Sequence, residues 1–243
     1  DQQTTHPESG GELTFALDPI FSVVIPVLNE ARTINDAVAR LYRDAGDRRI
    51  EVIVVDGEAR FRTLAAIADP RVVQVRSPAG RARQMNAGAA RAGGDLLLFL
   101  HADTILPPDG LGLVRRALDA SDRVGGAFDL GIDSRRLSLK LIEIVGGIRS
   151  RITRLPYGDQ AIFIRKDRFE QLGGFSDIPL MEDVDLMRRI KRRKWPIVIL
   201  PQKVRTSPRR WDREGVLYGT LRNWILLTLY LMGASPVRLA RYY

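Results

Sequence analysis

The 243-residue sequence contains no cysteine and only two histidines, His6 and His101. Without cysteine, the chain cannot form disulfides, zinc–thiolate sites or iron–sulfur clusters, and it has no thiol nucleophile. Two histidines are also too few for a multi-histidine metal centre within one chain.

Long apolar segments are missing as well. The longest apolar stretch covers residues 224–234 and is followed by Ser235-Pro236, whereas a helix that spans a bilayer needs roughly 20 apolar residues. Residues 1–19 are polar and lack the apolar core of a secretory signal, so we interpret them as a flexible leader. We therefore expect a cytoplasmic protein, and contact with a membrane face stays open as an alternative.

Charge is distributed unevenly along the chain. The net charge is +9, but residues 1–134 have a balance of −4 and residues 135–243 a balance of +13. A cationic half indicates anionic partners, and the candidates are nucleic acid, an acidic membrane surface and phosphorylated small molecules. The sequence has no motif for nucleic-acid recognition, and its aromatic residues are not interleaved with the basic run, so we do not expect nucleic-acid binding.

Strand and helix patterns alternate from residue 20 onward. Short β-branched or apolar runs predict strands, and apolar residues at helical spacing predict helices. The predicted strands cover 21–27, 50–55, 72–75, 96–100, 125–132, 160–165 and 197–200. The predicted helices cover 30–45, 63–68, 81–92, 110–120, 137–148, 166–172, 181–193 and 212–232. This alternation predicts an α/β fold with a mostly parallel sheet and helices on both faces.

Polar or acidic residues follow three of the predicted strands. Asn29, Asp56 and Asp103 stand beyond the carboxyl ends of the strands, where open parallel sheets bind ligands. Each could instead cap a turn or a helix, as Asn and Asp often do. Their coincidence at one sheet edge favours a binding site. The chain has neither a Gly-x-Gly-x-x-Gly crossover nor a phosphate loop that ends in Gly-Lys-Ser/Thr, which disfavours NAD or FAD enzymes and that class of NTPase.

Several motifs, in a fixed order, resemble one enzyme family. Val23-Val-Ile-Pro-Val-Leu-Asn-Glu30, Val54-Val-Asp-Gly57, a strand that ends in an Asp, and Met181-Glu-Asp-Val-Asp-Leu186 resemble the family 2 glycosyltransferases. The resemblance covers residues 20–215 and implies the GT-A fold, with residues 216–243 as an additional apolar helix and tail. It also implies an inverting enzyme that transfers a sugar from a nucleotide sugar.

Three further motifs narrow the resemblance. Gly80-Arg-Ala-Arg-Gln-Met-Asn-Ala-Gly88, Leu100-His-Ala-Asp-Thr104 and Tyr157-Gly-Asp-Gln160 resemble the branch that includes selenosugar synthases and enzymes assigned to arsenosugar pathways. This resemblance implies a UDP-sugar donor, UDP-N-acetylglucosamine or UDP-glucose, and selenophosphate as the acceptor.

The family resemblance implies roles for residues on the donor side. The nucleoside pocket would be lined by Pro26, Val27, Asn29 and Glu30. Asp56 would accept a hydrogen bond from the uracil N3–H, which suits a carboxylate, and Gly57 would lie close to the base. Arg83 and Asn86 share a helix face and could contact nucleotide or sugar. After Gly57 the chain departs from the family pattern, so no role is carried over to residues 58–63.

His101-Ala102-Asp103 occupies the position of the family's Asp-x-Asp motif. The resemblance implies that Asp103 holds a divalent cation, Mg²⁺ or Mn²⁺, which would bridge to the diphosphate of the donor. His101 replaces the first Asp of that motif. A neutral imidazole could bind Mn²⁺ better than Mg²⁺, donate a hydrogen bond to ribose or phosphate, or serve as a buried structural histidine.

Asp183 would be the catalytic base of the family, with Glu182 supporting it. The alternative is that these acids only stabilise the first turn of a helix. A base would take the proton from an acceptor hydroxyl. Selenophosphate is already anionic near neutral pH, so with this acceptor Asp183 would orient the nucleophile or balance charge instead.

The remaining candidates are assigned to the diphosphate and acceptor side, and they are Arg81, Gly158, Asp159, Gln160, Arg209, Arg210 and Trp211. Ser207-Pro-Arg-Arg-Trp211 resembles a shortened Gln-x-x-Arg-Trp motif, whose arginines could clamp the diphosphate while the Trp packs against the sugar. The alternative is that these arginines form a solvated basic surface.

The apolar stretch 224–234 leaves two alternatives open. Together with Arg222, Arg238 and Arg241 it could contact a membrane, and the acceptor would then be a polyprenyl phosphate. It could also be an ordinary packing helix or form a homodimer through residues 216–234. We favour this second alternative, because short apolar runs are more often buried.

Overall fold

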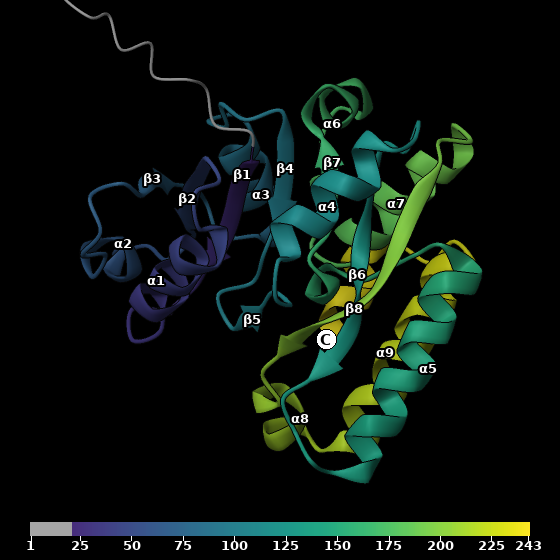
Figure 1. Ribbon diagram of the computed structural model, residues 1–243. Coiled ribbons are helices and arrows are strands. Elements are labelled where there is room, and N and C mark those ends of the chain that lie inside the picture. Colours follow the sequence, from purple (N-terminus) through teal and green to yellow (C-terminus); the bar gives the residue numbers. More distant parts are fainter. Residues whose placement is uncertain (1–20) are drawn as a thin grey trace, which may run out of the picture.

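The computed structural model describes residues 21–243 (Figure 1). The expected leader, residues 1–19, lies outside the described residues. The strands are β1 Phe21–Val27, β2 Ile50–Asp56, β3 Val73–Arg76, β4 Leu96–Phe99, β5 Thr104–Ile105, β6 Gly125–Ile132, β7 Phe163–Arg165 and β8 Ile197–Thr206. The helices are α1 Ile34–Ala45, α2 Arg62–Ala65, α3 Arg81–Ala89, α4 Gly110–Asp119, α5 Leu137–Thr153, α6 Lys166–Leu172, α7 Glu182–Arg192, α8 Arg209–Glu214, α9 Val216–Leu231 and α10 Pro236–Leu239.

The described strands join in one sheet with the order β3-β2-β1-β4-β7-β6-β8-β5. Strands β1 to β4 are parallel to one another, and β6 is parallel to β8. Strand β7 runs antiparallel between β4 and β6, and β5 runs antiparallel to the end of β8. The predicted α/β class with a mostly parallel sheet is therefore confirmed.

Both faces of the sheet are covered, which explains the continuous apolar strands in the sequence. Successive side chains of a strand point to opposite faces. Val24 and Ile53 belong to the core with α3, α7 and α9, whereas their neighbours Val23 and Val52 belong to the core with α1 and α4. A strand buried on both faces needs apolar residues at every position, so β1 and β2 lack the alternation of a half-exposed strand.

The C-terminal half differs from the sequence prediction in its boundaries. The predicted strand 197–200 continues to Thr206, because β8 pairs with β6 along its whole length with an irregularity after Phe128. The predicted helix 212–232 is two helices, α8 and α9, separated at Gly215 with a φ of 85°. No helix among residues 21–243 is both long and apolar enough to cross a membrane.

Helix α9 is packed against the domain that precedes it. Leu226, Leu227 and Tyr230 belong to the same core as helix α7, and the Tyr230 hydroxyl donates a hydrogen bond to Asp185 at 3.2 Å. In Figure 1, α9 also runs beside α5. Residues 216–243 therefore contribute to the packing of the sheet domain.

Candidate active site

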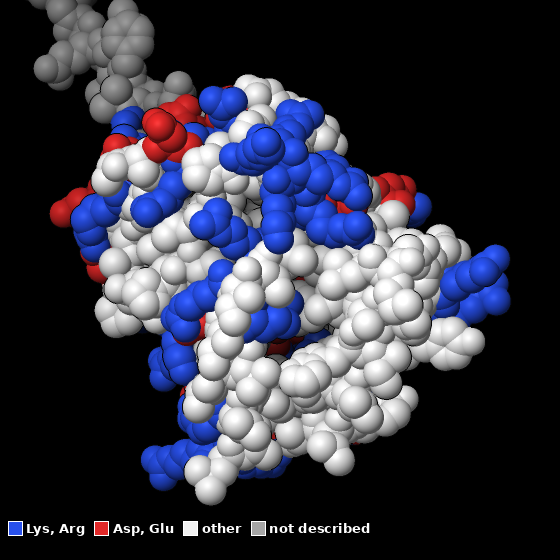
Figure 2. All heavy atoms as spheres, turned by 90° about the vertical axis from the view of Figure 1, so that its right-hand side faces the viewer, with Lys and Arg blue, Asp and Glu red and all other residues white. Residues whose placement is uncertain are grey.

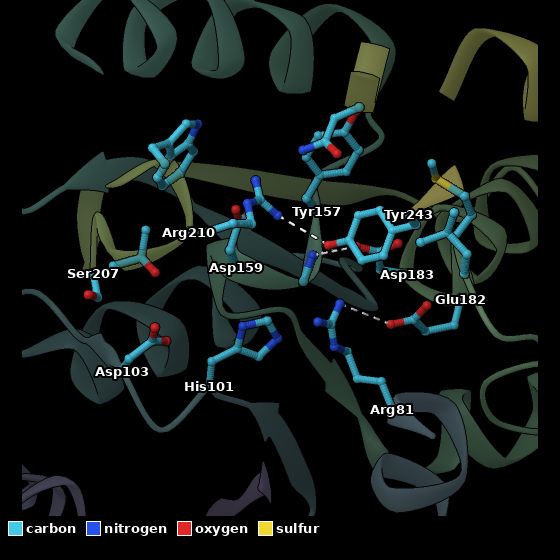
Figure 3. Close-up of a pocket in the computed structure, with 16 residues that line it drawn as sticks. Arg81, His101, Asp103, Tyr157, Asp159, Glu182, Asp183, Ser207, Arg210 and Tyr243 are labelled. Carbon is cyan, nitrogen blue, oxygen red and sulfur yellow. Dashed lines mark hydrogen bonds and ion pairs between the residues drawn. The ribbon is translucent and has the colours of Figure 1, made fainter. Parts of the chain in front are cut away.

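A cavity of about 210 Å³ lies where β4, β8 and the N-terminal end of α7 meet (Figure 3). Its lining consists of Arg81, His101, Asp103, Tyr157, Gly158, Asp159, Leu180, Met181, Glu182, Asp183, Thr206, Ser207, Arg210, Trp211, Asn223 and Tyr243. Most of the candidates for the metal, the catalytic base and the acceptor are thus brought together from segments far apart in the sequence.

Asp183 is held in place by two backbone amides. The Gly158 N–H donates to its Oδ2 at 2.6 Å, and the Val184 N–H donates to its Oδ1 at 2.7 Å. Asp183 lies in the first turn of α7, where the unpaired N–H groups and the helix dipole favour negative charge. The carboxylate is therefore fixed in direction at the wall of the cavity.

Gly158 separates Asp183 from His101. A methyl group added to Gly158 would lie 3.4 Å from Asp183 Oδ2 and 3.5 Å from His101 Nε2. The carboxylate and the imidazole therefore face the same small space, which the lack of a side chain at Gly158 leaves open.

Glu182 is buried beside Asp183, and its environment disfavours the charged form. Burial, and then the negative charge of Asp183, raise the pKa of Glu182 from 4.5 to about 7, although Arg81 opposes this shift. Arg81 Nη1 lies 3.5 Å from Glu182 Oε1, an ion pair that is drawn as a dashed line in Figure 3. Near neutral pH, the Glu182 carboxyl group is therefore only partly ionised.

This raised pKa predicts a dependence of stability on pH. The folded state keeps the proton of Glu182 to a higher pH than the unfolded chain does, so this contribution is present below about pH 4.5 and is lost as the pH rises through about 7. The variant Glu182→Gln lacks this titration. The difference in free energy of unfolding, variant minus wild type, should therefore increase by about 1–3 kcal/mol when the pH is raised from 5 to 8. Urea unfolding at both pH values measures this difference. A difference that does not change with pH would contradict the assignment.

His101 is neutral at physiological pH. Burial, and then the charges of Arg81 and Arg210, lower the pKa of His101 to about 3. A neutral imidazole can donate one hydrogen bond and accept another, and its free nitrogen can bind a metal ion. A neutral His101 is therefore compatible both with metal binding and with a hydrogen bond to ribose or phosphate, as expected from the sequence.

Asp103 adjoins the arginines that follow β8. Arg209 Nη2 lies 3.6 Å from Asp103 Oδ2 and 3.7 Å from Glu30 Oε2. Burial raises the pKa of Asp103, and the negative charge of Glu30 adds to this effect, while Arg209 opposes it. Asp103 is thus a carboxylate that a further cation would stabilise.

A second cavity adjoins the first between α5 and α9. Both cavities share Tyr157, Asp159, Arg210, Trp211 and Asn223 in their linings. The Tyr157 hydroxyl, Asp159 Oδ1 and Asn223 Oδ1 are buried and have no hydrogen-bond partner. Buried polar atoms are normally paired, so these three atoms indicate a place for a polar molecule.

Asp159 and Tyr157 are also electrostatically perturbed. Burial raises the pKa of Asp159, and the neighbouring Asp183 adds to the rise while Arg210 opposes it. Burial raises the pKa of Tyr157 to about 12, so its hydroxyl stays protonated and can donate. Figure 3 shows that Tyr243 reaches across the cavity to Arg210, whose Nη1 donates to the Tyr243 hydroxyl at 3.3 Å.

Comparison with known proteins shows the family of the chain. The sequence profile described as glycosyl transferase family 2 matches residues 22–175. The chain belongs to this family. The family that the motif order predicted is therefore confirmed.

Relatives agree with the family assignment. An N-acetylglucosaminyltransferase of Mesorhizobium japonicum is 35% identical over 130 residues, which cover 50% of this chain and 30% of that protein. An uncharacterised glycosyltransferase of Mycobacterium tuberculosis is 29% identical over 213 residues, covering 82% of this chain and 77% of that protein. The match thus spans less than a third of the first of these relatives.

Two solved glycosyltransferases share the fold. A mannosyltransferase from Pyrobaculum calidifontis, in complex with GDP-Man and Mn²⁺, superposes with a TM-score of 0.60 at 21% identity and covers 79% of this chain and 57% of that one. TarS from S. aureus, in complex with UDP-GlcNAc, gives a TM-score of 0.58 at 15% identity, covering 77% of this chain and 58% of that one. The predicted GT-A fold is confirmed.

The nucleoside candidates of this family 2 glycosyltransferase lie at the ends of β1 and β2, outside the cavity. Asn29 is exposed and accepts a hydrogen bond from Arg62 at 3.3 Å. Asp56 is completely buried, and its carboxylate accepts from the backbone N–H groups of Glu58, Thr63 and Leu64. A uracil could reach Asp56 only if the loop 57–63 moved, so in this structure Asp56 has the capping role that the sequence left as an alternative.

The ends of β1 and β2 also carry three further nucleoside candidates, Pro26, Val27 and Gly57. Pro26 and Val27 are the last residues of β1, and the backbone of Gly57 donates to the Val27 carbonyl at 3.1 Å. Gln84 packs against Gly57, and its amide donates to the carbonyls of Val27 and Val55. Gln84 thus joins the ends of β1 and β2, a role that sequence reasoning missed.

Five other candidates of this chain lie outside the cavity lining, namely Arg209, described above, and Arg83, Asn86, Ala102 and Gln160. Arg83 pairs with Asp177 at 2.8 Å on the surface. Asn86 exchanges two hydrogen bonds with the backbone of Phe175. Gln160 is buried and bonded to Ser150, Tyr157 and Phe128, and Ala102 packs in the core beside β4.

Sequence reasoning also missed several lining residues of the glycosyltransferase. Tyr157 begins the motif Tyr157-Gly-Asp-Gln160, and this motif was the available signal. Thr206 and Ser207 follow from the unexpected length of β8. Asn223 and Tyr243 reach the cavity only because α9 and the segment after it pack against α7, and no local pattern could indicate that.

Proposed function

We propose that this enzyme transfers a sugar from a UDP-sugar, with inversion at the anomeric carbon, to an anionic small-molecule acceptor. The observation that carries the proposal is the position of Asp183. It is fixed by Gly158 and faces His101 across a small space, in a cavity that also contains Asp103 and Arg210. This arrangement offers a carboxylate opposite a region suited to a diphosphate.

The donor is proposed to be UDP-N-acetylglucosamine or UDP-glucose. The complex of TarS with UDP-GlcNAc and the relative named as an N-acetylglucosaminyltransferase support the first of these. Glu30 and Asn29 would lie beside the nucleoside, and Arg209 and Arg210 beside the diphosphate. Arg209 already joins these two parts, because its guanidinium lies near both Glu30 and Asp103.

A divalent cation is proposed at Asp103. No group of three or more potential metal ligands occurs within residues 21–243, but Mg²⁺ and Mn²⁺ sites often combine one or two carboxylates with oxygens of a substrate phosphate. The half-buried Asp103 carboxylate fits such a cation, and the neutral His101 would add a nitrogen ligand. When bound, the cation would offset the charge of the leaving diphosphate.

In the proposed reaction, the acceptor attacks the anomeric carbon and the bond to the diphosphate oxygen breaks. Asp183 would take the proton of a hydroxyl acceptor, with the UDP leaving as an anion. For selenophosphate no proton needs to leave, and the selenium would form the new bond to carbon. Asp183 and Gly158 would then only position the acceptor.

The acceptor side supports an anion with several hydrogen-bonding groups. The second cavity is lined by Arg149 and Arg210 and by the unpaired Tyr157 hydroxyl, which can donate to an anion, while the unpaired Asp159 Oδ1 and Asn223 Oδ1 can accept from a protonated oxygen of the acceptor. Guanidinium groups bind phosphate-like anions through charge-assisted hydrogen bonds. Together with the selenosugar-synthase resemblance of the sequence, this favours selenophosphate as the acceptor.

The proposal predicts a selenium-containing sugar as the product. We expect incubation with UDP-N-acetylglucosamine or UDP-glucose, selenophosphate and Mg²⁺ or Mn²⁺ to release UDP and give this product by mass spectrometry. Parallel reactions contain GDP-mannose as the donor control, and inorganic phosphate or a polyprenyl phosphate as the acceptor. If a product forms only with polyprenyl phosphate, the assignment of selenophosphate as the acceptor is wrong. If only GDP-mannose is turned over, the assignment of a UDP-sugar as the donor is wrong.

A further inference from the structure

An extended apolar surface covers the outer side of helices α5 and α9. The exposed large apolar residues of α5 are Leu137, Leu141, Ile144, Ile148 and Ile152, and those in the first part of α9 are Leu217, Tyr218, Leu221, Trp224 and Ile225. We call these ten residues the α5–α9 face. Leu137, Ile152 and Leu217 are 86%, 76% and 83% exposed, so no part of the described chain covers them.

The regular spacing on α5 makes this a continuous stripe. Its five residues follow one another at intervals of four, three, four and four positions, which places them on one side of the helix. Figure 2 views the molecule from this side and shows a broad area without charged side chains. Contiguous exposed apolar patches of this kind mark interaction surfaces rather than ordinary solvent-exposed residues.

Basic residues border one end of the face. Arg154 ends α5, and Lys191 Nζ donates to the Thr153 carbonyl at 3.2 Å, which places the exposed run Lys191-Arg-Arg-Lys194 beside the same helix end. Figure 2 shows Lys and Arg gathered along the upper edge of the uncharged area. The sequence has no acidic residue in 186–211 or in 215–243.

The opposite end of the face carries charges of both signs. Exposed Arg135 lies beside exposed Asp133, and on α8 Arg213 pairs with Glu214 at 3.7 Å. A second copy of the chain packed in parallel along α5 would place the run Lys191-Arg-Arg-Lys194 against its own counterpart. Like charges across an interface oppose association, so this border disfavours a parallel homodimer, whereas it matches a surface that is anionic throughout.

We propose that the α5–α9 face docks this enzyme on an anionic lipid bilayer. An apolar helical face with Lys and Arg at its borders lies in the interface of a membrane, where apolar side chains enter the headgroup region and cations meet anionic headgroups. Docking of this kind needs no helix that crosses the membrane. Asp183 is not part of the face, whereas Trp224 belongs to the face and also lines the second cavity.

Vesicle flotation tests the proposal, with vesicles of phosphatidylcholine alone or mixed with phosphatidylglycerol. We expect the wild type to float with the mixed vesicles and to bind them less at high salt. The variant Leu141→Ser/Ile148→Ser should bind the mixed vesicles at least about tenfold more weakly than the wild type. The variant Arg192→Gln/Arg193→Gln should lose about fivefold per removed charge on the anionic vesicles only.

The control variant Arg43→Gln/Arg91→Gln removes two exposed cations that lie away from the face and should bind like the wild type. The proposal is overturned if the wild type stays soluble with anionic vesicles, or if the control loses as much binding as Arg192→Gln/Arg193→Gln. It is also overturned if the wild type forms a stable dimer that Leu141→Ser/Ile148→Ser dissociates. The assay contains no sugar donor, so its outcome is independent of the proposed transfer reaction.

Discussion

Replacement of Asp183 by Asn is expected to lower turnover with a hydroxyl acceptor, water included, by about 10²–10⁴-fold. This is the usual contribution of a positioned general base. The amide oxygen of the new side chain can still accept the hydrogen bond that Asp183 Oδ2 now accepts from Gly158, so the loop should keep its place. With selenophosphate the loss should be smaller, because this nucleophile needs no deprotonation. The measurement is kcat from UDP release with each acceptor.

Two comparisons sharpen this test. Asp183→Asn should bind UDP as tightly as the wild type does, whereas Asp103→Ala should lose affinity for UDP in the presence of Mg²⁺ or Mn²⁺, measured by calorimetry. Asp177→Asn removes a carboxylate of the exposed pair with Arg83 and should leave both properties unchanged. Full turnover by Asp183→Asn with every acceptor would remove Asp183 from the proposed mechanism.

Replacement of Gly126 by Ala is expected to destabilise the protein by about 3 kcal/mol or more. A methyl group at Gly126 would lie 2.0 Å from the backbone oxygen of Val198 in β8 and 2.9 Å from the ring of Phe163 in β7. The oxygen belongs to a paired strand and cannot move aside, so β6 and β8 must separate. For a chain of this size, the melting temperature should fall by about 6–12 °C.

Gly146 provides a matched control in α5. A methyl group there would have its nearest neighbour, Leu130 Cδ2, at 3.5 Å, an ordinary contact. Ala is also favoured over Gly within a helix by about 0.5–1 kcal/mol. Gly146→Ala should therefore melt at the same temperature as the wild type or slightly higher. A Gly126→Ala protein that melts like Gly146→Ala would contradict the close approach of β6 and β8.

The first half of the fold was predictable because its signals are local. The β-branched runs of β1 and β2 and the Ala-rich α3 mark buried strands and a helix by composition alone. The boundaries in the second half depend on contacts between distant segments. Strand β8 continues to Thr206 because β6 pairs with it, and the break between α8 and α9 occurs at Gly215. Propensity does not record a pairing partner that lies about 70 residues earlier in the chain.

For the site, motif order predicted the elements but not the direction of each side chain. Arg81, Arg83 and Asn86 all lie on α3, yet only Arg81 lines the cavity. Asn86 instead holds the backbone of Phe175, a contact that depends on how α3 and α6 are placed. The roles that the resemblance implies for substrate binding and catalysis stay predictions.

The short pairing of β5 with β8 has a further consequence for how the cavity can change shape. Thr104 pairs with Thr206, so the residue after Asp103 and the residue before Ser207 belong to the same two-residue ladder. Asp103 and the arginines of α8 are therefore coupled mechanically and shift as one unit. The wall of the cavity that carries Asp103 and Arg210 is thus tied to the edge of the sheet. The opposite wall, which Tyr243 forms from the chain end beyond α10, has no such ladder to hold it.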